Sequence, residues 1–284
     1  IVRNTVTEVA WVSRKIENGR IEDDYAFGIE PQTAKILAET VVPGADADPD
    51  LSRLVPAEFV STTRYNFNDA QIAWRSLMLT ARTKTDQVSG GLLMAFSSSL
   101  FEPYGVDDPE AFLNSVGSNL QTARFDADGD EVAVIVRIKD LAQLKRSVAK
   151  ELSLSKRPQM FENAEMWRSA DGELAAAFIE DHVVIGEAKS VERCLAARNG
   201  GQNLASVSAN ALFNNLSVPI STYGTESDAA GGLVSVLSEQ NAKEPLLSQT
   251  YTTETRFNQY GIERRTVSDL GMIGAIIEKL GTSR

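Results

Sequence analysis

The chain has 284 residues, with 28 Lys and Arg against 39 Asp and Glu, for a net charge of −11 at pH 7. This charge repels phosphate backbones and offers no attractive field at an anionic membrane, so we expect no nucleic-acid partner. A hydrophobic fraction of 43% is ordinary for a globular protein, and this length suits one large domain or two closely packed halves.

Three features bear on the membrane and the compartment. No apolar run reaches the roughly 18 residues that a membrane span needs, so we expect no membrane span in the mature chain. The sequence opens at Ile1 rather than Met, so we expect either a processed form, as removal of a signal peptide or anchor would leave, or a chain that lacks its true start. Cys194 is the single cysteine, which leaves no partner for a disulfide within the chain and leaves the redox compartment undecided.

The first predicted unit is a β-hairpin followed by a short helix. Residues 6–13 are rich in β-branched and aromatic side chains, and Asn18-Gly19 suits a tight turn before the returning strand 21–29. Pro31 suits the first turn of a helix, which Pro43-Gly44 ends.

The same order recurs three more times, each unit having two strands, a turn and a capped helix. The strands are expected at 121–126 with 132–138, at 174–179 with 183–185, and at 251–257 with 262–267. The turns are Asp128-Gly129, residues 180–182, and Asn258 with Gly261. The helix caps are Asp140, Ser190 and Ser268.

The last of these helices, from Ser268 to Leu280, is apolar on more than one face. One face carries Leu270, Ile273, Ile277 and Leu280, and another carries Met272 and Ile276. Gly271 and Gly274 would each cost helix propensity of roughly 1 kcal/mol, which requires a packing benefit from close approach. We therefore expect this helix to be buried on both sides.

The remaining elements complete the predicted fold. Strands near 59–62 and 219–223 lead to helices after Asp69 and Asp228, and further helices fit 86–100 and 108–116, the latter with Asp108 as cap and Pro109 at its first position. The expected linkers are 43–56 and 153–159.

The fold class is α+β, with antiparallel sheets built from repeated β-hairpin-plus-helix units and helices packed on one face. We expect a single α+β region, 1–284, with an internal pseudo-repeat, and 1–154 and 155–284 as alternative halves.

The inventory of reactive side chains is short. Because the sequence has a single histidine, it excludes every metal site or catalytic mechanism that needs two. His182 follows Glu180 and Asp181 at a predicted hairpin tip, where turn geometry rather than proton transfer determines the residue. Cys194 falls on the apolar face of a helix, where a thiol is a small buried hydrophobe with a raised pKa. The sequence therefore predicts no catalytic, cofactor-binding or metal-binding residue.

Three motif-like stretches favour a structural interpretation. Asp126, Asp128 and Asp130 resemble the start of a calcium loop, but glycine is fourth rather than sixth and Arg137 occupies the twelfth position, so an acidic hairpin turn is favoured. The loop acids Asp46, Asp48 and Asp50 form at most a weak cation cluster. Two S-x-x-K matches, at 147–150 and 153–156, lack the motifs that accompany a penicillin-recognising serine.

Several stretches resemble an uncharacterised family of exported bacterial proteins. They are Leu54-Val55-Pro56-Ala57, residues 108–113, Ala175-Ala176 and Phe178 with Val184-Ile185-Gly186, and residues 261–266. The resemblance implies export behind an N-terminal signal or anchor, and hence the bacterial periplasm or cell surface. It implies no activity and no active-site residues.

Two functions remain open from the sequence. The first is a non-enzymatic binding or scaffolding protein of the bacterial cell envelope, with a protein or a small molecule as partner. The alternative is a hydrolase that uses carboxylates in a cleft. Two carboxylates with mutually shifted pKa values in one cleft would favour the hydrolase, and a broad exposed apolar patch would favour the binding protein.

Overall fold

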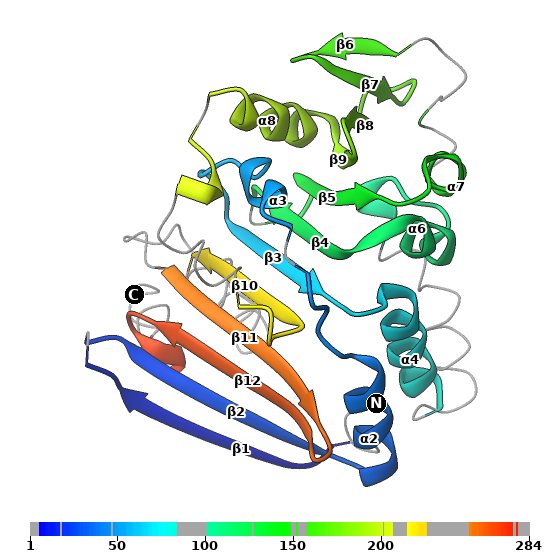
Figure 1. Cartoon of the computed structure of the whole chain (residues 1–284). Helices are drawn as coiled ribbons and strands as arrows, with labels where there is room; N and C mark the ends of the chain where they lie inside the picture. Colours follow the sequence, from blue (N-terminus) through cyan, green and yellow to red (C-terminus); the bar gives the residue numbers. More distant parts are fainter. Residues whose placement is uncertain are drawn as a thin grey trace.

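The described strands of the protein form one antiparallel sheet. A computed structural model describes residues 6–17, 19–46, 48–83, 101–126, 128–148, 152, 158–200, 202–206, 215–225, 250–274 and 277. Within these ranges, twelve strands pair in the order β1-β2-β12-β11-β10-β3-β4-β5-β9-β8-β7-β6 (Figure 1). The strands are β1 (Val6–Lys15), β2 (Ile21–Ile29), β3 (Ser61–Asn66), β4 (Val116–Arg124), β5 (Val132–Ile138), β6 (Gln159–Phe161), β7 (Ala164–Arg168), β8 (Leu174–Ile179), β9 (His182–Glu187), β10 (Ile220–Thr225), β11 (Thr250–Asn258) and β12 (Gly261–Ser268). The predicted α+β class with antiparallel pairing is confirmed.

Turn chemistry explains where the predicted hairpins form. Gly19 and Gly129 adopt φ of 85° and 88°, which non-glycine residues rarely adopt, and they close the β1–β2 and β4–β5 hairpins. At the β11–β12 turn, the side chain of Asn258 accepts hydrogen bonds from the backbone N–H groups of Tyr260 and Gly261.

The helices with described bounds are α2 (Pro31–Thr40), α3 (Asp50–Arg53), α4 (Ala70–Thr83), α6 (Pro109–Ser115), α7 (Leu141–Ser147) and α8 (Ala188–Arg198), with 3-10 turns η2 (Glu102–Tyr104) and η3 (Leu204–Ser206). Side-chain caps begin α2, α6, α7 and α8, whereas α3 begins without one. The predicted caps Asp108 and Asp140 accept hydrogen bonds from the N–H groups of Ala111 and Gln143. The predicted cap Ser190 is wrong, because Glu187 caps α8 and Ser190 lies inside the helix. The predicted helices at 86–100 and after Asp228 lie outside the described residues.

Helices cover both faces of the sheet, which corrects the expectation that they pack on one face. In β5, Ile135 belongs to the core that holds α3 and α8, whereas Val136 belongs to the core that holds α6 and α7. Successive side chains of a strand point to opposite faces, so the unbroken apolar run 132–136 serves two cores. We call these sides the α8 face and the α6 face; α2 and α4 continue the α6 face (Figure 1).

The order of the strands interleaves the two ends of the chain. The three strands β10, β11 and β12 lie between β2 and β3, so β12 pairs with β2 and β10 pairs with β3. The first hairpin, β1–β2, joins the rest of the sheet only through β12. Strand pairing therefore ties the first described residues to the last.

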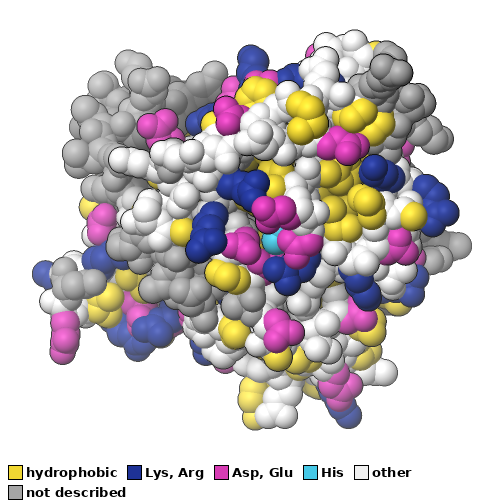
Figure 2. Space-filling model, turned by 45° about the horizontal axis from the view of Figure 1, so that its top comes forward, with side chains coloured by type: hydrophobic (Ala, Val, Ile, Leu, Met, Phe, Trp, Pro, Cys, Tyr) yellow, Lys and Arg dark blue, Asp and Glu magenta, His cyan; other side chains and the backbone are white. Residues whose placement is uncertain are grey.

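The segment 43–56 is an integral part of the core, which corrects its assignment as a linker. It contains α3, and Leu51, Leu54 and Val55 are at most 3% exposed. Its Asp48 carboxylate contacts His182, and Figure 2 shows this single imidazole among acidic and basic side chains. An apolar residue at each of these positions marks the segment as core despite its three aspartates.

The hairpin β6–β7 was not predicted. Its turn residues Glu162 and Asn163 have φ of 48° and 64°, so two consecutive residues with positive φ close it. The predicted linker 153–159 ends where β6 begins, and its residues 153–157 lie outside the described residues.

The last helix is more exposed than its sequence predicts. Residues 271–274 and 277 are helical, and the Ser268 hydroxyl accepts a hydrogen bond from the N–H of Gly271, as a cap should. Ile273 and Ile277 are 51% and 63% exposed, so the prediction of burial on both sides is wrong for the face that they share. Close approach is confirmed at Gly271, where an added Cβ would lie 2.5 Å from Cγ2 of Ile21.

No helix among the described residues combines the length and the apolar character that a membrane crossing requires.

Candidate functional site

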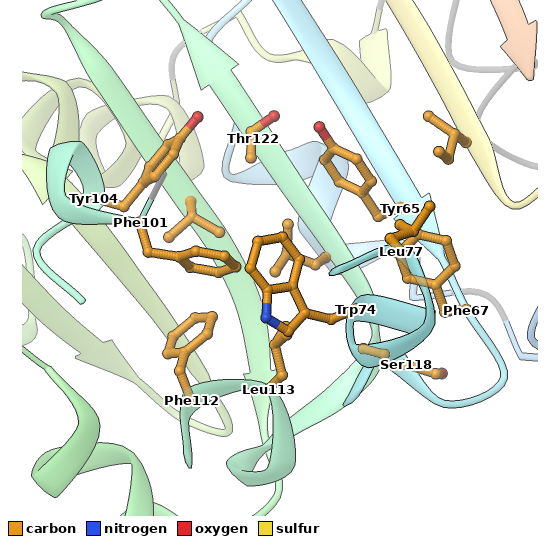
Figure 3. A pocket seen from close by; sticks show the side chains of 14 residues that line it. Tyr65, Phe67, Trp74, Leu77, Phe101, Tyr104, Phe112, Leu113, Ser118 and Thr122 are labelled. Atoms are coloured by element: carbon orange, nitrogen blue, oxygen red, sulfur yellow. The ribbon is translucent and has the colours of Figure 1, made fainter. Parts of the chain in front are cut away.

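The most ligand-like site in the described part of the chain is an apolar cavity on the α6 face. Its volume is about 310 Å³ (Figure 3). It is lined by Tyr65, Phe67, Ala70, Trp74, Leu77, Phe101, Tyr104, Phe112, Leu113, Ser118, Leu120, Thr122, Val134 and Ile220. The lining comes from four neighbouring strands and from the helices that cover them.

The strands supply the floor of the cavity. Tyr65 of β3 pairs directly with Leu120 of β4 and with Ile220 of β10, so these three side chains form one row. Thr122 and Val134 pair in the same way between β4 and β5. Directly paired residues of antiparallel strands project to the same face, so the register of four strands places all five side chains on one floor.

An aromatic cluster supplies the opposite wall. Trp74 of α4 meets Phe101 edge-on, with ring centroids 5.0 Å apart, and Phe101 meets Phe112 of α6 at 6.3 Å. Figure 3 shows these three rings grouped together. Edge-to-face packing fixes their orientation and holds α4 and α6 at a defined height above the sheet.

Hydroxyl groups give the cavity one polar side. In Figure 3, the hydroxyls of Tyr65, Tyr104 and Thr122 point the same way, away from the aromatic cluster. Burial raises the pKa of Tyr104 to about 12 and also raises the pKa of Tyr65, so both phenols stay protonated at neutral pH. No described lining residue carries a charge at neutral pH. The walls therefore suit an apolar molecule with a hydrogen-bonding end.

A second feature is a cluster of four charged side chains, Asp48, Arg137, Asp181 and His182, which we call the His182 cluster. The imidazole Nε2 lies 3.0 Å from Oδ2 of Asp48, and Nδ1 lies 2.8 Å from Oδ1 of Asp181. The Nε of Arg137 lies 3.1 Å from a carboxylate oxygen of each aspartate. Arg137 and His182 pair directly across β5 and β9 on the α8 face, so the cluster and the cavity lie on opposite faces.

The charges in the His182 cluster stabilise one another. Burial alone would lower the pKa of His182, but the hydrogen bond and charge of Asp48, with the charge of Asp181, raise it overall. Burial alone would raise the pKa of Asp48, but His182 and Arg137 lower it. Both ring nitrogens are committed to carboxylates, so neither is positioned to activate a nucleophile. His182 lies at the start of β9, is 3% exposed and fastens the segment 43–56 to the sheet.

The structure buries Cys194 as the helix pattern predicts. The residue is fully buried on α8, and burial raises the pKa of its thiol to about 12. The thiolate is therefore a negligible species at neutral pH.

The other motif-like stretches also have structural partners. The carboxylate of Asp126 accepts hydrogen bonds from the N–H groups of Gly129 and Asp130, so it closes the predicted acidic turn. Within the described ranges, no three His, Cys, Asp or Glu side chains are grouped closely enough to hold a metal ion. Ser147 of the first S-x-x-K match is buried and donates to the carbonyl of Leu144, while the lysines of both matches lie outside the described residues.

Sequence reasoning missed both features. The sequence does carry one signal for the cavity, the closely spaced aromatic residues Tyr65 at the end of β3, Phe67 just after it, and Trp74 of α4, all of which line it. The His182 cluster has none, because Asp48 and His182 are 134 residues apart. Only the sheet register brings them together.

The fold and the cavity define an α+β protein with a large antiparallel sheet and a preformed apolar site between the sheet and its helices. No protein-family model, no curated protein and no solved structure matches the chain.

Proposed function

We propose that the protein is a non-enzymatic binding protein of the bacterial cell envelope, and that its ligand is a small apolar molecule held in the cavity. The observation that carries this proposal is the cavity itself, about 310 Å³ in volume, walled by aromatic and aliphatic side chains. Preformed, mostly apolar concavities with a few polar groups are typical of small-molecule sites.

The volume of the cavity limits the size of the ligand. An engineered cavity of about 150 Å³ lined by apolar side chains binds benzene, so twice that volume suits about twelve non-hydrogen atoms. A single aliphatic chain with a hydroxyl or carbonyl at one end fits both the apolar walls and the hydroxyls of Tyr65, Tyr104 and Thr122. The polar end would lie near these hydroxyls, since each can donate or accept a hydrogen bond.

The charged groups of the described chain do not favour the hydrolase alternative. A general acid among the carboxyls needs a raised pKa, whereas every described carboxyl with a clearly shifted pKa is shifted down: Glu22, Asp48, Glu110 and Asp171. The side chain of Asp48, which is 6% exposed, is committed to His182 and Arg137, and it lies on the face away from the cavity. A binding function needs no general acid, so it accounts for the cavity better than the hydrolase alternative does.

Titration with straight-chain alcohols tests the proposal. Trp74 is the reporter, in a background where the other two tryptophans are replaced (Trp11→Phe, Trp167→Phe). Each added methylene should lower the Kd about fourfold, because its burial contributes about 0.8 kcal/mol. The gain should stop near 1-undecanol, of about twelve non-hydrogen atoms, where the cavity is full.

A matched pair of variants on α4 locates the binding. Ala70→Phe fills the cavity and should abolish the fluorescence response, whereas Ile72→Phe adds a ring at a position that is 48% exposed and outside the lining. Equal binding by both variants, or no binding by the parent at any chain length, would refute the proposed site.

Two parts of the proposal rest on the sequence. The envelope location rests on the resemblance to exported bacterial proteins, and fractionation of cells that express the full gene product tests it.

We also propose that the hairpin-and-helix order reflects repeated units, supported by the hairpins β1–β2, β4–β5 and β8–β9, each followed directly by a helix. Superposition of the four predicted units on one another tests this part: unrelated backbone paths would contradict it.

A further inference from the structure

The two edges of the sheet differ in a way that points to a partner. The edge strand β6 has three residues, which is the usual means of limiting an open edge. The other edge strand, β1, has ten residues, of which nine are exposed. Val9 and Val12 are 62% and 56% exposed, and the strand contains no proline. Such an edge is a template for a further strand.

The hydrogen-bonding groups on the outer side of β1 follow from its register with β2. The N–H of Ile16 donates to the carbonyl of Arg20, so the groups of residue 16 face β2. Alternation along the strand makes the even-numbered residues face β2 and the odd-numbered residues face outward. In agreement, the N–H of the odd-numbered Ile29 in β2 points away from β1 and donates to Tyr260. The register shifts between Val6 and Glu8, so this alternation holds from Glu8 onward. The outward groups of β1 are therefore those of Val9, Trp11, Ser13 and Lys15.

The sequence of β1 is complementary to itself about Trp11. In an antiparallel pair with a twofold axis at this residue, Trp11 opposes itself, Glu8 opposes Arg14, and Val9 opposes Ser13. The Trp11–Trp11 and Val9–Ser13 pairs of this register join outward-facing residues, and no like charges are opposed. A register centred one residue to either side places Glu8 or Arg14 opposite an apolar residue and loses the charge pairing.

We propose that β1 is a dimerisation edge, and that its occupant is β1 of a second copy of this chain, paired antiparallel about Trp11. The interface is isologous, because each Glu8 meets the other copy's Arg14. The twofold axis brings the two Trp11 side chains together beside the stack that Trp11 forms with Tyr25, at 6.4 Å between ring centroids. One strand pair is small compared with the interface of an obligate dimer, so the association is reversible and depends on concentration.

Sedimentation equilibrium of the full chain, from about 1 to about 300 µM, tests the association. The parent should pass from monomer to dimer and go no further, because a twofold pair of edges closes. Glu8→Lys places a cation opposite Arg14 twice per dimer and should raise the dimer Kd about tenfold. Val9→Pro removes an outward N–H from each chain and should raise the Kd by a similar factor, whereas the control Val9→Thr keeps that N–H and should leave it unchanged.

Cysteine cross-linking tests the register independently. At the twofold axis, Trp11→Cys places two Cα atoms about 5.5 Å apart, within the range of a disulfide. In the control Ser13→Cys, the two cysteines lie four residues out of register. Their Cα atoms are about 13 Å apart, which is too far for a disulfide. The native Cys194 does not compete, because it is fully buried.

Each outcome bears on the proposal. A disulfide-linked dimer with Trp11→Cys but not with Ser13→Cys supports the stated register. A chain that stays monomeric across the concentration range, a dimer that is indifferent to both Glu8→Lys and Val9→Pro, assemblies larger than a dimer, or equal cross-linking at positions 11 and 13 would each overturn it.

Discussion

At the scale of single residues, the His182 cluster decides how the segment 43–56 is attached. Three segments meet there: Asp48 from the segment itself, Arg137 from β5, and Asp181 of the β8–β9 turn with His182 at the start of β9. The imidazole lies between two carboxylates, so its protonated form donates from both nitrogens. Attachment of the segment is therefore linked to protonation of one side chain.

The first prediction is a loss of stability on the alkaline side. The pKa of His182 is raised above its ordinary value of 6.5, so its contribution is complete below that value and is lost as the pH rises through the raised pKa. The pKa of Asp48 is lowered from 3.8, so its contribution is lost only as the pH falls below that value. Urea unfolding at a series of pH values from 5 to 9 should show stability falling from about pH 6.5 upward.

Two variants serve as controls for this prediction. His182→Gln keeps a hydrogen-bond donor but cannot take up a proton, so its stability should change less over the same pH range. Asp48→Asn removes the principal partner and should also flatten the profile. Parallel profiles for the parent and both variants would show that other groups govern the pH dependence.

At the scale of elements, the last helix packs against the sheet at a glycine rather than at the large apolar residues that follow it. Gly271 has a φ of 70°, and an added Cβ would lie 2.5 Å from Cγ2 of Ile21. Ile273, two residues later, is 51% exposed. The helix therefore contacts β2 through its first turn rather than through its apolar stripe.

The second prediction compares these two positions. Gly271→Ala should destabilise the protein by about 1 to 3 kcal/mol, because it adds backbone strain and a steric clash. Ile273→Gln should change the free energy of unfolding by no more than about 0.5 kcal/mol, as is usual for exposed positions. Chemical denaturation of both variants measures the difference, and the reverse ranking would contradict the described packing.

Elements with distinctive ends could be predicted from the sequence. The expected strands 21–29, 132–138 and 174–179 coincide with β2, β5 and β8, because turn residues mark their ends and apolar or β-branched residues fill them. The hairpin β6–β7 was missed because its turn residues, Glu162 and Asn163, lack the glycine that marked three of the four predicted hairpins. The cap of α8 was misassigned because Ser190 is a common cap residue, while Glu187 is not.

The parts that could not be predicted depend on contacts between distant segments. The cavity needs β10 beside β3 and α4 above both, and the His182 cluster needs residue 48 beside residue 182. Local sequence determines whether a strand forms, but not which strand lies beside it. The apolar run 132–136 does contain a usable signal, since an unbroken run rather than alternation indicates a strand covered on both faces.

At the scale of the whole molecule, the interleaved strand order bears on domain organisation. The alternative halves 1–154 and 155–284 would separate β2 and β3 from β12 and β10, the strands that they pair with. Either half alone would have long unpaired edges in place of the central strands of the sheet.

The third prediction is that the chain unfolds as one unit. Near-ultraviolet circular dichroism and tryptophan fluorescence should report the same transition midpoint, as two-state unfolding requires. Fragments 1–154 and 155–284, expressed separately, should each lack a cooperative transition. A fragment that unfolds cooperatively by itself would identify an independent domain.

The same strand order determines when, during synthesis, the hairpin β1–β2 can pair with the rest of the sheet. Among the described strands, those of the hairpin β1–β2 are made before all others, whereas β12, the strand that connects this hairpin to the sheet, is made after all others. At about 5 to 20 residues per second, the hairpin waits on the order of 10 to 50 seconds for that partner. A lone two-stranded hairpin is at best marginally stable in water, so β1 and β2 remain accessible to chaperones or export factors until β12 has been made.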